Sequence, residues 1–198
     1  MKLFYSATSP YVRKVIACAI TREIDSQIER IPSGPASAEA LVQANPLAKV
    51  PTLVTSDGVA LFDSPVICEY LDTIGEAPPL FPAHGAHRWL ALKYQALADG
   101  IMDAAVMTRG EVLRPAEPAR QKNIDHQKAA VARSLAVLEA QLPSAGTPDI
   151  GTLAVACALG YLDFRFAEDG WRGQFPRLLH WFEGISSLPG LSTTIPPG

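Results

Sequence analysis

The chain has 198 residues, of which 48% are hydrophobic and 19% charged, and its formal net charge at pH 7 is −3. This composition excludes a disordered chain, and the length suffices for one large domain or two small domains with cores of their own. The small negative charge, with Lys and Arg scattered along the sequence, gives no broad attraction for nucleic acid or for an anionic membrane.

The first part of the chain predicts alternating strands and helices. Residues 2–6 form a strand candidate, and residues 10–21 have apolar side chains at helical spacing behind Ser9, which is the natural N-cap. The elements expected next are a strand at 26–31, a short helix at 38–43, strands at 52–55 and 59–62, and a helix at 66–74. The hairpin signal Ser56-Asp57-Gly58 joins the last two strands. The resulting order, β-α-β-α-β-β-α, is that of a thioredoxin-like domain that opens with a right-handed crossover.

The rest of the chain predicts helices. Prolines at 78, 79 and 82 interrupt helix and strand patterns alike, so residues 78–86 are expected to link two domains. The helices expected beyond this linker cover residues 87–112, 119–142, 153–166 and 176–186, and residues 193–198 are expected to be a loose tail. We therefore predict an α/β plus all-α protein, with a thioredoxin-like N-terminal domain at 1–77 and an all-helical C-terminal domain at 87–198. The helix expected at residues 153–166 is apolar around most of its circumference, which predicts a central buried position.

Targeting and metal signals are not found in the sequence. No segment reads as a membrane span, and the first residues lack the basic start and apolar run of a signal peptide, so the cytoplasm is the expected location. Cys18, Cys68 and Cys157 are far apart and no C-x-x-C occurs, so we expect buried thiols and neither a redox dithiol nor a zinc site. The four histidines are not spaced as ligands, and no metal is expected.

The most informative residues precede and follow the predicted hairpin. Val50-Pro51 lies directly before a strand, where the X-Pro bond is a candidate for the cis form. A cis bond there would turn the amide and carbonyl of Val50 outward, where an extended peptide could pair with them. Asp63, Ser64 and Pro65 have the pattern of an N-cap and a helix start, whose free N–H groups suit a carboxylate. Together, the loop and the helix end indicate a small peptide ligand.

These motifs resemble those of the glutathione S-transferase family, in particular its small bacterial members. In that family an N-P-x-x-x-V-P segment, here residues 45–51, precedes a thioredoxin-like strand, and an acidic residue plus serine open the next helix. Ser9-Pro10 matches the family's first helix start, Asp149-Ile150-Gly151-Thr152 matches a capping signal in its second domain, and the resemblance covers the whole chain. It implies that glutathione is a cosubstrate, that its thiolate attacks a small apolar electrophile held between the domains, and that the protein is a homodimer.

The resemblance also raises Ser9 from an ordinary N-cap to the candidate catalytic residue. A thiol with a pKa of about 8.5 is mostly protonated at neutral pH. A helix N-terminus with a hydroxyl aimed at the sulfur would stabilise the thiolate and so lower this pKa. Tyr5 and Thr8 are the alternatives, because some branches of the family use a tyrosine at the end of the first strand.

Four further residues would hold the tripeptide if the resemblance extends to the binding site. Val50 would offer its backbone to the cysteinyl unit, and Ser64 would bind the γ-glutamyl carboxylate. Asp63 would favour the γ-glutamyl ammonium, although capping alone also explains an Asp-Ser pair before proline. Lys49 would pair with the glycyl carboxylate, and a solvated lysine is the alternative.

The resemblance leaves two questions open, the acidic partner and the reaction. Related proteins often place an acidic residue of the long helix across a dimer interface near the amine of glutathione; Asp99 is the candidate here and Asp103 the alternative. The reaction could instead be disulfide reduction, dehalogenation or isomerisation, or the chain could be a catalytically idle regulatory protein that binds glutathione. Disulfide exchange through an enzyme thiol would require cysteine in place of Ser9.

Overall fold

A computed structural model describes residues 1–144 and 146–197 of the chain. The chain divides into two compact units, one formed by Met1–Arg88 with the segment that begins at Leu188, and one formed by Trp89–Ser187. The first unit contains a small mixed sheet with helices and the second is helical, which confirms the predicted α/β plus all-α fold class. The segment after Leu188 lies in the first unit, whereas the sequence placed it in the helical domain.

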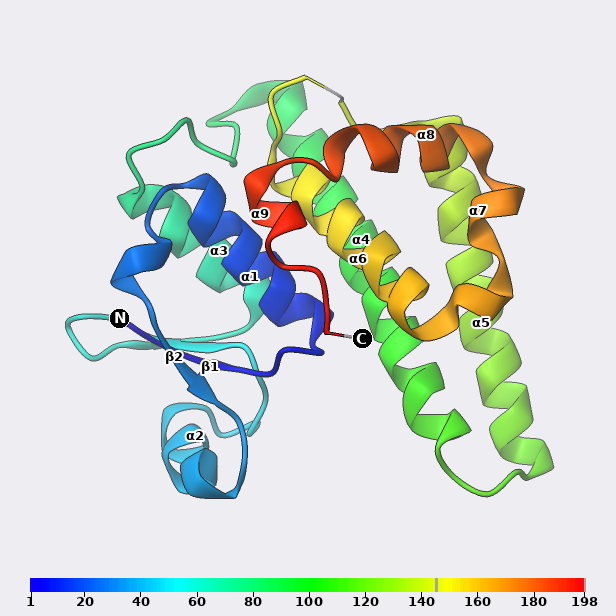
Figure 1. The fold of residues 1–198 in the computed structure, drawn as a ribbon, viewed down its shortest axis with the longest axis horizontal. Helices are drawn as coiled ribbons and strands as arrows, with labels where there is room; N and C mark the ends of the chain where they lie inside the picture. Colours follow the sequence, from blue (N-terminus) through cyan, green and yellow to red (C-terminus); the bar gives the residue numbers. More distant parts are fainter. Residues whose placement is uncertain (145, 198) are drawn as a thin grey trace. The chain divides into compact units, whose positions relative to one another are not determined.

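The first unit is built around a four-stranded sheet with the order β2-β1-β3-β4. Its strands and α-helices are β1 (Lys2–Tyr5), α1 (Pro10–Thr21), β2 (Glu29–Pro32), α2 (Ala38–Ala44), β3 (Thr52–Val54), β4 (Ala60–Leu61), α3 (Ser64–Ile74) and α9 (Pro189–Ser192). β1 pairs with β2 in parallel and with β3 antiparallel, and β3 pairs antiparallel with β4. Helices α1 and α3 lie side by side over the sheet, and α2 lies on its other side (Figure 1).

The second predicted strand begins three residues later than the sequence indicated. Asp25–Gln27 form a 3₁₀ turn, in which the N–H of Ile28 donates to the carbonyl of Asp25 at 3.0 Å. These residues therefore use their backbone groups locally and leave only Glu29–Pro32 to pair with β1.

The exit from α3 is fixed by a buried ion pair. The Arg22 guanidinium lies 2.9 Å from the Asp72 carboxylate, and these side chains are only 4% and 8% exposed. The same carboxylate accepts the N–H groups of Leu80 at 2.7 Å and Phe81 at 3.1 Å, while Arg22 donates to the carbonyl of Gly75. The proline-rich segment therefore leaves α3 along a defined path.

The C-terminal segment is packed against α1 within the first unit. Arg13 donates from Nη2 to the carbonyl of Leu191 at 3.1 Å and from Nε to the hydroxyl of Thr194 at 3.3 Å. Gly190 allows this close approach, since a Cβ at that position would lie 2.6 Å from the carbonyl oxygen of Ala17. The expectation of a loose tail is therefore wrong for Thr194, and Gly198 lies outside the described residues.

The second unit is organised around one buried helix. Its α-helices are α4 (Gly85–Val112), whose first turn belongs to the first unit, α5 (Pro118–Ala140), α6 (Ile150–Phe166), α7 (Trp171–Gln174) and α8 (Pro176–Ile185). Every residue of α6 from Ile150 to Leu162 is buried, which confirms the predicted central position. Asp149 caps this helix by accepting the N–H of Thr152 at 2.8 Å. The segment Ile150–Asp169 is long and apolar enough to cross a membrane, but 72% of its apolar stretch is buried, as in the core helix of a packed domain.

Candidate functional site

Three separate chain segments meet at the edge of the sheet where strands β1 and β4 end. Because β1 and β4 are both antiparallel to β3, they run in the same direction and end at the same edge. Phe4 near the end of β1 pairs with Thr52, the first residue of β3, and Leu61 at the end of β4 pairs with Leu53. The start of α1, the loop before β3 and the start of α3 therefore lie together, and we call this place the sheet-edge site.

Ser9 contributes the start of α1 to the sheet-edge site. Its backbone is extended, its carbonyl accepts the N–H of Arg13 at 3.0 Å, and its hydroxyl accepts the N–H of Val12 at 3.3 Å. This geometry confirms the predicted N-cap. The hydroxyl acts as an acceptor in the contact with Val12, so its own hydrogen can still be donated to a ligand atom.

The two alternatives to Ser9 lie in the segment that leads into α1. Tyr5 belongs to β1 and pairs in register with Pro32 of β2. The hydroxyl of Thr8, which is exposed, lies 3.3 Å from the hydroxyl of Ser6. Neither residue occupies the cap of α1.

The loop before β3 presents the backbone of Val50. The Val50-Pro51 bond is cis, as the sequence predicted. Within residues 1–144 and 146–197, no hydrogen bond uses the N–H or carbonyl of Val50, so both groups are available to an extended ligand. Lys49 is exposed, and its side chain makes no ion pair in the described part of the chain.

Asn45 positions this loop, and its role was missed from the sequence. The side chain is 1% exposed. Its Nδ2 donates to the carbonyl of Lys49 at 3.2 Å and to the hydroxyl of Thr52 at 2.9 Å, and its Oδ1 accepts the N–H of Leu47 at 2.9 Å. Ala48 completes the turn with a left-handed φ of 52°. The Asn-Pro pair signals a turn in the sequence, but not which groups the buried amide binds.

The start of α3 differs from the sequence expectation in one respect. Asp63 occupies the N-cap position with extended backbone, but its side chain makes no capping hydrogen bond. The N–H groups of the first turn therefore lack a side-chain cap, and the first of them belongs to Ser64, which is 1% exposed. An uncapped helix start with a hydroxyl beside it is a suitable environment for a carboxylate.

The remaining predicted site residues lie in the second unit. Asp99 is half-buried and Asp103 exposed, and both are on α4. Among the described residues, no group of three or more His, Cys, Asp and Glu side chains is arranged to hold a metal ion.

Thiol chemistry by the protein itself is not favoured by the positions of its cysteines. Cys18, Cys68 and Cys157 are free and buried. The Cys18 thiol donates to the carbonyl of Cys68 at 3.7 Å. The side-chain hydrogen bond with Cys68, followed by burial, raises the pKa of Cys18 well above its ordinary value. A thiolate at the sheet-edge site would therefore have to come from a ligand.

Comparison with known proteins gives consistent matches along the chain. Residues 8–74 match the N-terminal domain of glutathione S-transferases, and residues 121–184 match the C-terminal domain. The GST-like protein YibF of Escherichia coli (strain K12) is 39% identical over 202 aligned positions, which cover 100% of this chain and 99% of that protein.

Two crystal structures of a glutathione transferase family member from Pseudomonas fluorescens Pf-5 are also similar. One, with bound glutathione, is 41% identical with a TM-score of 0.93 and covers 100% of this chain and 99% of that one. The other, with bound S-(propanoic acid)-glutathione, is 39% identical with a TM-score of 0.88 and covers both chains fully, at 100% each.

Proposed function

Because the chain belongs to the glutathione S-transferase family, we propose that it binds reduced glutathione at the sheet-edge site and conjugates it to a small apolar electrophile. The observation that carries this proposal is the convergence of unused hydrogen-bonding groups at one edge of the sheet. A cis-proline loop offers both backbone groups of Val50, and the start of α3 offers uncapped N–H groups beside Ser64. A short extended peptide with a terminal acid matches this set.

The similar Pseudomonas fluorescens structures favour conjugation over other glutathione chemistry. That protein holds glutathione in one crystal and S-(propanoic acid)-glutathione in the other. The second ligand is a thioether, which is the product form of a conjugation reaction. At 39–41% identity over the full chain, a site that accepts both ligands is a reasonable expectation for this protein.

In the proposed complex the tripeptide lies extended along the loop before β3. The cysteinyl unit pairs with the N–H and carbonyl of Val50, as one strand pairs with another. The hydroxyl and N–H of Ser64 bind the γ-glutamyl carboxylate, which the dipole of α3 also attracts. Asp63 faces the γ-glutamyl ammonium and Lys49 the glycyl carboxylate. An acidic residue of α4, Asp99 or alternatively Asp103, approaches the same ammonium from the partner subunit of a homodimer.

The chemical step requires the thiolate form of glutathione. A thiol with a pKa of about 8.5 is only about 3% ionised at pH 7, whereas a pKa of about 7 makes about half of it reactive. Ser9 lowers the thiol pKa by donating its hydroxyl hydrogen to the sulfur at the positive end of α1. The thiolate then attacks the electrophilic carbon, forming the S–C bond while the leaving group departs with its bonding electrons.

The cytoplasm is the compartment we propose for this reaction. The cytosolic glutathione pool is kept reduced, and thiols there stay unpaired. The three free cysteines of the chain are compatible with that environment.

The proposal is tested by separating turnover from binding in a Ser9→Ala variant, with Thr8→Ala as the matched control. A hydrogen bond to a charged group contributes about 1.5–3 kcal/mol, so turnover of a generic aryl halide at pH 6.5 should fall about 10- to 100-fold. The apparent pKa of the rate profile should rise by about one to two units, because the thiolate has lost its donor. The affinity for glutathione should change little.

Two outcomes would change the assignment. Full activity of Ser9→Ala with an unshifted pH profile would show that Ser9 is only an N-cap. Tight glutathione binding by the wild-type protein, without turnover of any electrophile, would instead favour an idle glutathione-binding protein.

A further inference from the structure

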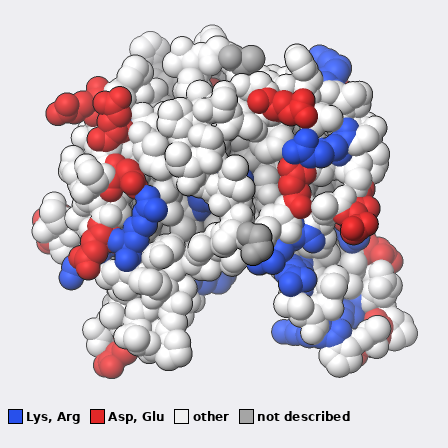
Figure 2. Space-filling model, in the orientation of Figure 1, with Lys and Arg blue, Asp and Glu red and all other residues white. Residues whose placement is uncertain are grey.

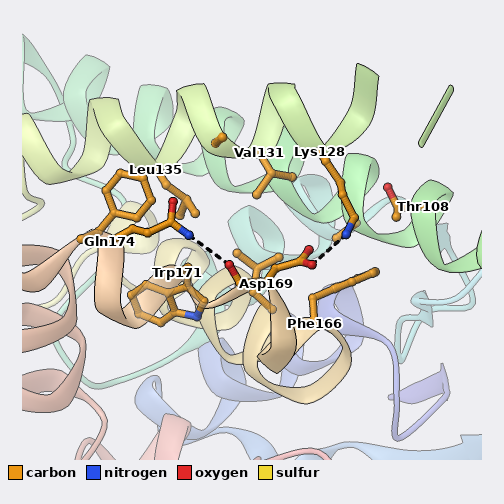
Figure 3. A pocket seen from close by; sticks show the side chains of 12 residues that line it. Thr108, Lys128, Val131, Leu135, Phe166, Asp169, Trp171 and Gln174 are labelled. Carbon is orange, nitrogen blue, oxygen red and sulfur yellow. Dashed lines mark hydrogen bonds and ion pairs between the residues drawn. The ribbon is translucent and has the colours of Figure 1, made fainter. Parts of the chain in front are cut away.

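A cavity of about 220 Å³ lies among the helices of the second unit. Val131 and Leu135 of α5 form one wall, while Phe166 at the end of α6 and Trp171 of α7 face them across the cavity (Figure 3). All residues that line it belong to Trp89–Ser187. The cavity therefore shares no residue with the sheet-edge site.

The rim of the cavity carries a matched pair of charges. The Lys128 ammonium lies 2.7 Å from the Asp169 carboxylate, and each side chain is 44% exposed, so the rim meets solvent. Gln174 donates to the backbone carbonyl of Asp169 at 3.0 Å, as the second dashed line in Figure 3 shows. The rim thus has no net charge to offer an ionic ligand.

The polar groups inside the cavity are already hydrogen-bonded. The indole N–H of Trp171 donates to the Asp163 carboxylate at 2.8 Å, and the hydroxyl of Thr108 donates to the carbonyl of Ala104 at 2.8 Å. These groups therefore offer few unused hydrogen-bonding partners to water inside the cavity. An apolar ligand that covers the Val131, Leu135, Phe166 and Trp171 side chains would remove their apolar surface from water, which favours binding.

The aromatic wall is held in place before any ligand arrives. Trp171 packs edge-on against Phe182, with ring centroids 5.9 Å apart and an interplanar angle of 65°. This packing and the bond to Asp163 fix the indole from two sides. A preformed wall reduces the ordering that ligand binding would otherwise require.

We propose that this cavity binds a neutral aromatic compound of one or two fused rings. An apolar cavity of about 150 Å³ is known to hold benzene, so a cavity larger by about half has room for a second ring. An anion would meet the Asp169 carboxylate at the rim, where the charge of Lys128 is already balanced by that carboxylate. Neutral ligands avoid both penalties.

The test uses naphthalene as the probe and equilibrium dialysis as the measurement. Ala132 lines the cavity from α5 but is exposed, so Ala132→Phe fills the space without disturbing the core. Ala129→Phe, on an exposed position of the same helix outside the lining, is the matched control. We expect the wild type and Ala129→Phe to bind one naphthalene per chain, and Ala132→Phe to bind at least tenfold more weakly.

Two further measurements locate the ligand and test its charge. A crystal soaked with 1-bromonaphthalene should show the bromine anomalous signal between Leu135 and Trp171. The anion 2-naphthoate should bind at least tenfold more weakly than naphthalene.

Three outcomes would overturn the proposal. These are equal naphthalene binding by both variants, absence of binding up to the solubility limit, and preference for the naphthoate anion. Glutathione titrations of the same variants should remain unchanged, so a failure here leaves the proposed function standing.

Discussion

At the scale of single residues, the buried cysteines make a direct prediction about reactivity. Only a thiolate reacts with disulfide reagents, and the raised pKa of Cys18 keeps that thiol protonated in the folded protein. We expect no rapid reaction of the native protein with an aromatic disulfide reagent at pH 8, and release of three equivalents after denaturation. One thiol that reacts within seconds in the native protein would contradict this account.

The raised pKa of Cys18 also makes the free energy of unfolding depend on pH. Because the folded-state pKa of Cys18 lies above the unfolded value of about 8.5, its contribution to stability is fully present below that pH. The contribution is lost as the pH rises above it, since only the unfolded chain then ionises.

The sequence predicted some site residues well because their signals are local. The cap formed by Ser9 and the cis bond before Pro51 each depend on two or three neighbouring residues. The hydrogen bonds of Asn45 and the missing cap of Asp63 depend on where a side chain points after folding. No pattern in a single sequence determines that direction.

At the scale of secondary-structure elements, the Arg22–Asp72 pair should dominate the stability of the α3 exit. Removing one partner of a buried pair leaves an uncompensated charge, which typically costs about 3–5 kcal/mol. We expect Asp72→Ala to lower the free energy of unfolding by about that amount in urea titrations, since Leu80 and Phe81 also lose their acceptor.

Glu69 provides the control for this prediction. Its ion pair with Arg88 is also 2.9 Å long, but the Glu69 side chain is 54% exposed. Exposed pairs contribute about 0–1 kcal/mol, so Glu69→Ala should change stability little. Equal effects of the Glu69 and Asp72 substitutions would refute the role given to burial.

The longer helices were predictable from the sequence, and the four-residue helices were not. Helices α1 and α3 were expected from apolar side chains at helical spacing, and α6 from a long segment that is apolar around most of its circumference. Helices α7 and α9 have four residues each and show no period. The packing of α9 on α1 depends on Arg13 and Gly190, which are far apart in the sequence.

At the scale of the whole molecule, the homodimer that the family resemblance implies can be tested at an exposed apolar pair on α4. Trp89 and Leu90 on α4 are 70% and 44% exposed. Aromatic side chains are enriched in protein–protein interfaces, so Trp89 is the residue that we expect at the contact. We expect sedimentation velocity to give twice the mass of one chain, and Trp89→Asp to shift the protein toward monomer.

Leu113 is the matched control for the dimer, because it is also exposed, at 67%, but lies just beyond the end of α4. Leu113→Asp should leave the dimer intact. A wild-type protein that sediments as one chain at micromolar concentration would rule the homodimer out.

The face of the molecule in Figure 2 carries charges of both signs. Figure 2 shows Lys and Arg side chains mixed with Asp and Glu side chains on both sides of the view, in line with the net charge of −3.

The two-part architecture was predictable from the proline-rich segment and the change in periodicity. The return of the chain end to the first unit was not, because it depends on tertiary contacts alone.

Calorimetric titration with reduced glutathione tests the sheet-edge site most directly. Ser64→Ala removes the proposed carboxylate ligand, whereas Ser56→Ala changes an exposed serine in the hairpin at the opposite edge of the sheet. We predict one glutathione per chain for the wild type and Ser56→Ala, and a dissociation constant about 10- to 100-fold higher for Ser64→Ala. No binding heat with the wild type, or unchanged affinity in Ser64→Ala, would contradict the proposed site.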